Sequence, residues 1–174
     1  MIPRRVLGVD PGASGGWAVV DHQGKLVGLG IFPTQTVKRS TKNVTMIDGP
    51  ALAALFESAD PTHAFVENVH SRPRQAGQFN FGLNTGVVHG LIYAAGVDMH
   101  LVSPASWKAV YGIKRSDDET KSDTKSHARQ LAAEIYPQHA HLFKRVKDDG
   151  VAEALLIALY GLACLQRDDE ATRQ

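Results

Sequence analysis

The sequence is poor in cysteine, in net charge and in long apolar runs, and each shortage excludes a class of protein. Its one cysteine, Cys164, excludes a disulfide framework and any site with several cysteine ligands. The formal net charge at pH 7 is +1, so the overall balance gives no sign of a polyanionic partner. No apolar run approaches the roughly 18 residues that span a bilayer, and MIPRRVLGVDPG lacks the apolar core of a signal peptide. We therefore expect a cytoplasmic protein that does not enter a membrane.

What remains is the composition of an ordinary globular domain. The chain has 174 residues, 43% of them hydrophobic, which is enough for one domain with a substantial core. Neither an internal repeat nor a low-complexity linker divides it. We therefore expect a single domain over residues 1–174, in which 166–174 form a polar C-terminal tail.

The order of predicted strands and helices indicates an α/β fold. Apolar runs bounded by Gly-rich or polar turns predict strands over 5–10, 16–20, 25–32, 63–69 and 98–103. Helical spacing of apolar residues predicts helices over 48–58, 79–95, 104–112, 126–137 and 148–165. The segments KRSTKN and SDDETKSDTKS are expected to be polar loops. This order predicts a five-stranded mixed sheet, with three antiparallel strands and then parallel ones, flanked by helices on both faces.

Four carboxylates lie in unusually apolar surroundings at the ends of these elements. Asp10 ends the first predicted strand, and Glu67 lies near the end of the fourth. Asp149 and Glu153 open the last helix. Carboxylates that are buried together repel one another unless a divalent cation lies among them. Oxygen ligands without cysteine favour Mg²⁺ or Mn²⁺, so the four acids predict a metal site.

Each acid also has a simpler structural interpretation. Asp10 begins a good turn sequence, and Asp149 could cap the last helix. Glu153 could pair with a lysine, and Glu67 could hold a basic side chain of the following loop. Helical geometry favours Asp149 over Asp148 as the partner of Glu153, because positions four apart differ by about 40° around the axis and positions five apart by about 140°. The choice between Asp148 and Asp149 stays open.

Taken in order, these segments resemble the RuvC-like Holliday junction resolvases of the RNase H-like superfamily, in particular the shorter phage-type members. The resemblance rests on LGVDPGASGGWAVV at the first strand, AFVENVH at the fourth and DDGVAEALLIA on the last helix, and it covers about residues 5–163. It implies a homodimeric crossover junction endodeoxyribonuclease of a bacterial or phage-infected cytoplasm. Such an enzyme resolves four-way DNA junctions by symmetric paired phosphodiester hydrolysis, using two Mg²⁺ ions per active site, for which Mn²⁺ can substitute.

The resemblance also implies roles for the acids. Asp10, Glu67 and Glu153 match three of the family's catalytic metal ligands. The family spaces its last two acids by three residues, and that spacing falls here on Gly150. Asp149, at a spacing of four, is the substitute on the same helix face.

Basic residues complete the implied site. Lys125 resembles a catalytic lysine of the family, and Lys108 resembles a lysine that holds the scissile phosphate. An exposed helical lysine is an equally good interpretation of each. The other implied DNA contacts are Lys121, His70, Arg72 and Arg74.

One helix carries a further signal. Gly82, Gly86 and Gly90 recur every four residues, a spacing that lets another backbone approach one face of the helix. The resemblance implies that this backbone belongs to the second subunit.

Two other functions would share most of these features, namely an RNase H-like nuclease that cuts forks, flaps or RNA–DNA hybrids, and a catalytically silent branched-DNA-binding protein.

Overall fold

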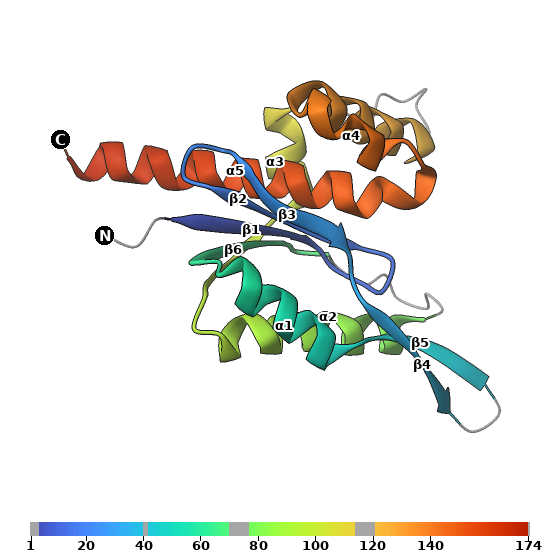
Figure 1. Ribbon diagram of the computed structural model, residues 1–174. Helices are drawn as coiled ribbons and strands as arrows, with labels where there is room; N and C mark the ends of the chain where they lie inside the picture. Colours follow the sequence, from blue (N-terminus) through green and yellow to red (C-terminus); the bar gives the residue numbers. More distant parts are fainter. Residues whose placement is uncertain (1–3, 40–41, 70–76, 114–120, 174) are drawn as a thin grey trace.

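The computed structural model describes residues 4–39, 42–69, 77–113 and 121–173, excepting the side chains of Arg39 and of 121–125. A five-stranded sheet in the order β3-β2-β1-β6-β7 lies between two helical layers (Figure 1). Its strands are β1 (Arg5–Asp10), β2 (Gly16–Asp21), β3 (Leu26–Ile31), β6 (His63–Glu67) and β7 (Asp98–Val102). The first three are antiparallel, whereas β1, β6 and β7 are parallel. The predicted mixed sheet is confirmed.

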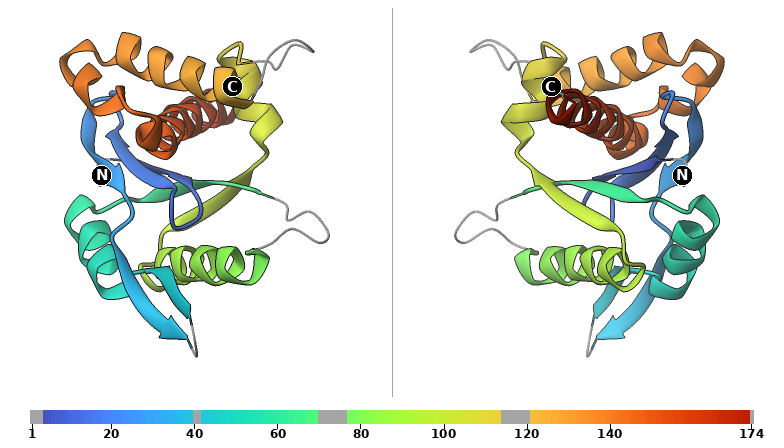
Figure 2. Two further views of the ribbon diagram at one scale, coloured as in Figure 1. Left: turned by 90° about the vertical axis from the view of Figure 1, so that its right-hand side faces the viewer. Right: turned by 90° about the vertical axis from the view of Figure 1, so that its left-hand side faces the viewer.

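Helices cover both faces of this sheet (Figure 2). One face carries α1 (Gly49–Ala59) and α2 (Gln78–Ala94). The other carries α3 (Pro104–Val110), α4 (Lys121–Ile135) and α5 (Asp149–Thr172), with the 3₁₀ turns η1 (Pro137–Phe143) and η2 (Val146–Asp148) before α5. The sheet therefore separates two apolar cores, one on each face.

The first part of helix α5 is buried because it lies directly on β1 and β2. Every residue from Asp149 to Ala158 is buried. The contact is close because glycines face the helix: a Cβ at Gly8 would lie 2.1 Å from the Ala154 carbonyl oxygen. A Cβ at Gly16 would lie 2.7 Å from the backbone of Gly150. Although α5 has 24 residues, no helix in the described ranges is long and apolar enough to cross a bilayer.

The segment KRSTKN, predicted as a polar loop, has its described residues, 38–39 and 42–43, in a second, two-stranded sheet instead. Its strands are β4 (Thr34–Arg39) and β5 (Lys42–Ile47), which pair antiparallel over six register positions. The prediction followed the polarity of the segment and overlooked the β-branched residues on either side of it, which favour strands: Thr34, Thr36 and Val37 before it, and Val44 and Thr45 after it. Residues 38–39 and 42–43 pair at the outer end of a β-ribbon that leaves the body of the molecule (Figure 1).

Two helices are longer than their apolar patterns predict. Helix α4 begins at Lys121, five residues before the predicted start at 126, and α5 continues to Thr172. Residues 166–172, expected as part of a polar tail, therefore form the last turns of α5. Polar residues extend both helices because a turn that projects from the core needs no apolar face.

The close approach of α5 gives a test of the fold. We expect Gly8→Ala to lower the free energy of unfolding by about 3 kcal/mol, because the added methyl group meets the backbone of α5, which cannot rotate away. Urea denaturation measures this. Gly30→Ala on β3 is the matched control, since its Cβ would lie no closer than 3.5 Å to any atom, and we expect a change within about 1 kcal/mol. Equal effects of the two substitutions would contradict the close packing.

Candidate active site

The four predicted acids meet at one edge of the sheet. Strands β1 and β6 are parallel, so Asp10 and Glu67 lie at the same edge. Helix α5 begins there and supplies Asp149 and Glu153. All four line one cavity of about 880 Å³. The structure thus brings together the acids that the sequence predicted.

The turn after Asp10 holds this edge in place. Gly12 has a φ of 113°, which disfavours any residue with a side chain, and the Gly15 N–H donates to its carbonyl oxygen at 3.0 Å. This tight turn lies against the first turn of α5. A Cβ at Gly150 would lie 2.8 Å from Gly15 backbone atoms and 3.0 Å from Asp10 Oδ2. A side chain at position 150 does not fit, so an acid three residues before Glu153 is excluded in this chain.

Asp149, and not Asp148, belongs to the cavity. The Asp148 carboxylate accepts hydrogen bonds from the Arg145 backbone N–H at 2.9 Å and from its guanidinium at 3.0 and 3.1 Å. Burial acts to raise the pKa of Asp148, but the bonds from Arg145 outweigh it, so the pKa lies below its usual value. Asp148 is not among the residues that line the cavity, whereas Asp149 is. Asp148 therefore stabilises the turn before α5.

Three of the acids bond to side chains of the helices that cover α5. Trp107 Nε1–H donates to Glu67 Oε1 at 2.9 Å. Lys108, the next residue of α3, donates from Nζ to Glu153 Oε1 at 3.0 Å. Arg129 of α4 pairs with Asp149. Glu153 therefore pairs with a lysine, as its simpler structural interpretation predicts, and this pairing does not exclude a role as a metal ligand.

Two of these partners were not predicted. No functional role was predicted from the sequence for Trp107, which is fully buried and donates to Glu67. Arg129 was not singled out at all. It follows Lys125 by four residues, and positions four apart share a helix face, so that spacing was the available signal. Lys147, for which no role was predicted from the sequence, lines the cavity as well.

The donor set suits a hard divalent cation, because carboxylate oxygens are the ligands that Mg²⁺ and Mn²⁺ prefer. Within the described ranges, however, no three Asp, Glu, His or Cys side chains already form a cluster that could hold a metal ion. Glu67, Asp149 and Glu153 bond to other side chains instead. Metal binding would require these carboxylates to share or exchange their present partners.

The predicted basic residues are only partly placed. Lys108 lines the cavity. Lys121 and Lys125 lie in the first turns of α4, where the backbone alone is described. His70, Arg72 and Arg74 lie outside the described residues. The roles of these last five stay predictions.

Comparison with known proteins extends the description of the fold. No protein-family model and no curated protein matches the chain by sequence. The structure is similar to RuvC of Thermus thermophilus in complex with a Holliday junction substrate, with a TM-score of 0.56, 14% identity and coverage of 93% of this chain and 96% of that one. A second T. thermophilus RuvC structure gives a TM-score of 0.53 and 16% identity over the same shares. The yeast mitochondrial Holliday junction resolvase Ydc2 gives a TM-score of 0.50 and 18% identity, with coverage of 91% of this chain and 78% of that one. The chain therefore has the RuvC-like form of the RNase H-like fold.

Proposed function

We propose that this protein is a divalent-metal-dependent endodeoxyribonuclease that resolves four-way DNA junctions in a bacterial or phage-infected cytoplasm. The observation that carries the proposal is the meeting of four carboxylates from β1, β6 and α5 on one cavity, in a chain with the RuvC-like fold. A structural neighbour is a RuvC bound to a Holliday junction, which supports branched DNA as the substrate class.

The acids and the neighbouring cations would divide the work. Asp10, Glu67, Asp149 and Glu153 would hold the metal. Two Mg²⁺ ions, when bound, supply an activated water and stabilise the leaving oxygen in an in-line phosphodiester hydrolysis.

The cations beside the acids would bind the phosphate. Lys108 bonds to Glu153 and lines the cavity, so its ammonium group can bind a phosphate oxygen there. Arg129 does not itself line the cavity, but it pairs with Asp149, which does, and would contact phosphate from beside that residue. Lys125 precedes Arg129 by one helical turn, which supports its proposed role at the scissile phosphate.

A second subunit would pack against α2. Gly82, Gly86 and Gly90 are exposed, and a Cβ at any of them would meet no atom of the described chain within 4 Å. At either end of this stripe, Phe79 is 70% and Tyr93 65% exposed. An open glycine stripe with large apolar neighbours supports a close helix contact with another copy. Two copies would provide the two active sites that paired cuts need.

One observation favours a second candidate, a branched-DNA-binding protein without catalysis. Glu67, Asp149 and Glu153 bond to other side chains, and the described residues hold no preformed metal cluster. Such a protein would bind junctions without cutting them. The cleavage assay separates the two candidates.

The first prediction concerns metal-dependent cutting. With an end-labelled four-way junction and Mg²⁺, we expect paired nicks that EDTA abolishes. Asp10→Asn should lower the nicking rate by more than about 100-fold, because loss of a group that only supports a metal ligand already costs up to about 100-fold. Glu57→Gln, which removes an exposed carboxylate of α1, is the matched control and should cut normally. Junction binding without nicks would favour the silent binder, and cutting of an RNA–DNA hybrid alone would indicate a ribonuclease H.

The second prediction separates the two adjacent aspartates. We expect Asp149→Asn to abolish nicking while the protein stays folded. We expect Asp148→Asn to lower the free energy of unfolding by about 1–3 kcal/mol, because it weakens the charged bonds to Arg145, and to leave nicking by the folded fraction in place. Nicking rates and urea denaturation of both variants measure this. The reverse pattern would make Asp148 the ligand.

The third prediction concerns the subunit contact. Gly86→Leu should convert a dimer to a monomer in sedimentation, because its side chain fills the space that the partner needs, and paired nicks should become single nicks. Ala54→Leu adds an apolar side chain to an exposed position of α1 and should change neither property. A wild-type monomer, or a dimer that tolerates Gly86→Leu, would place the contact elsewhere.

A further inference from the structure

The β4–β5 ribbon leaves the body of the molecule at the edge of the sheet that carries the four acids (Figure 1). We propose that this ribbon is an arm that binds the phosphate backbone of a DNA duplex flanking the cleavage site. The inference rests on the proposed function for its substrate and goes beyond it, because none of the acids or cations of the cavity belongs to the ribbon.

The root of the ribbon is fixed beside the cavity. Strand β3 runs in the same direction as β1, so it ends at the same edge, and its last residue, Ile31, lines the cavity. Phe32 and Ile47 at the root are 1% and 3% exposed. The Ile47 N–H donates at 2.8 Å to Oδ1 of the buried Asn84 of α2. The ribbon is therefore a continuation of the active-site edge with a rigid base.

Beyond the root, the ribbon buries little. Val37 and Val44 face each other in register and are partly buried, whereas Thr36, Lys38 and most of their neighbours are exposed. A two-stranded ribbon of this kind is only marginally stable by itself. The ribbon has too few apolar residues to form an apolar docking surface, and its exposed residues are polar.

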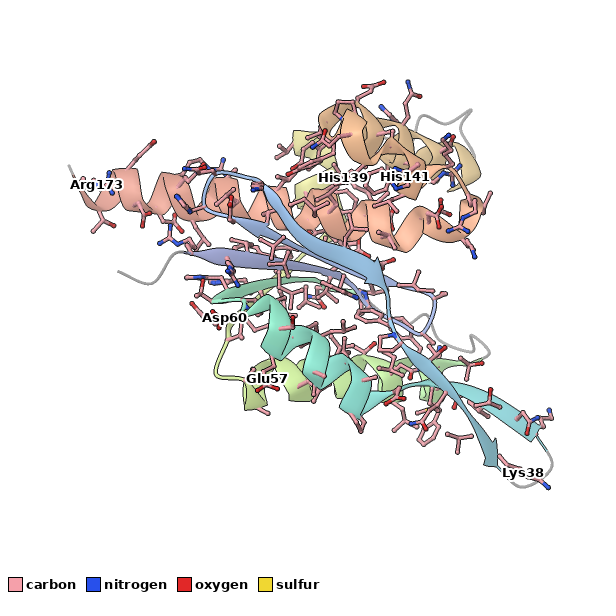
Figure 3. The ribbon with its side chains drawn as sticks, viewed as in Figure 1. Lys38, Glu57, Asp60, His139, His141 and Arg173 are labelled. Carbon is pink, nitrogen blue, oxygen red and sulfur yellow. The ribbon has the colours of Figure 1, made fainter. Side chains whose placement is uncertain are left out.

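That polar surface carries charge of one sign. Residues 34–47 contain two lysines and one arginine but no acid. Lys38 lies at the far end of the ribbon and points away from the body (Figure 3), and Lys42 on the other strand is also exposed. Gln35, Thr36 and Thr45 add exposed groups that can bond to phosphate or sugar oxygens. A basic arm without acids suits a polyanion.

The reach of the arm identifies which part of the DNA it meets. Lys38 follows Thr34 by four residues, which is roughly 14 Å at about 3.4 Å per residue. Along a duplex this is the rise of about four base pairs at about 3.4 Å each. A ribbon of this length can reach the duplex beside the cleavage site, so we expect its contacts on linear DNA as well.

Two alternative roles for the ribbon lead to different expectations. Lysines also protect open strand edges from pairing with other chains, and the ribbon could instead pack on a second copy. In both cases the loss of the lysines would change self-association and not the salt dependence of DNA binding. Two identical ribbons would repel each other through their charges, which favours the phosphate partner.

The test compares salt dependences. The variant Lys38→Gln with Lys42→Gln removes two charges from the arm, and Lys25→Gln with Arg173→Gln removes two exposed charges elsewhere, at the β2–β3 turn and the end of α5. Each pair is made with Asp10→Asn, so that bound DNA stays intact. Affinities for a four-way junction and a linear duplex are measured between about 50 and about 200 mM salt by fluorescence anisotropy.

We expect the arm variant to lower the slope of log K against log salt by about 1.8 on both DNAs, since each lost phosphate contact contributes about 0.9. When salt rises fourfold over that range, the arm variant should therefore lose roughly 12-fold less affinity than its parent. The control pair should keep the parent slope. Equal slopes for arm variant and parent, or a change confined to light scattering and sedimentation, would overturn the proposal.

Cutting by the same variants with Asp10 intact keeps this proposal separate from the proposed function. A slope change in proteins that never nick a junction would support the arm and reject the nuclease. If the protein makes paired nicks but its salt slope does not change when Lys38 and Lys42 are replaced, the nuclease is supported and the arm is rejected.

Discussion

The site depends on one packing constraint, the direct contact of α5 with the backbone of β1 and of the turn that follows it. At Gly8, Gly16 and Gly150 no side chain separates helix from sheet, and a Cβ at any of them would lie within 3 Å of backbone atoms of the other element. The first turn of α5 is therefore held against the end of β1. This brings Asp149 and Glu153 to the cavity that Asp10 already lines.

A buried group of acids must be compensated, and the helices that cover α5 supply the compensation. Glu67, Asp149 and Glu153 are 7%, 7% and 5% exposed, so leaving them without partners would be costly. α3 provides a donor and a cation, and α4 provides a second cation. These cations stabilise the carboxylates of the free protein, and under the proposed function they would also bind phosphate.

The sequence was sufficient for the five strands of the mixed sheet and for the position of the acids at the ends of its elements, because both follow from local patterns. Apolar runs give strands, and a carboxylate at the end of such a run is visible without a structure. The lysine partner of Glu153 could be foreseen, but two other partners were missed, because Trp107 and Arg129 are distant in sequence from Glu67 and Asp149. The only local signal was the spacing of Arg129 from Lys125. The β4–β5 ribbon was missed for a different reason. Its residues are polar, and pairing of such strands depends on a root that only the packing of Phe32 and Ile47 provides.

Helix α2 links the two surfaces that the cavity does not explain. Asn84 holds the root of the ribbon, while the glycine stripe of the same helix faces open space. A subunit contact on that stripe would fix each ribbon relative to the symmetry axis, because root and contact share one rigid helix. A two-fold dimer would then present two cavities and two basic ribbons with the same symmetry, as a junction of paired arms requires. In a monomer the ribbon could bind a duplex but could not set its direction relative to a second cut. Under the proposed function, the contact on α2 would determine the distance between the two cuts, and the ribbons would determine the direction in which the DNA duplexes approach the cavities.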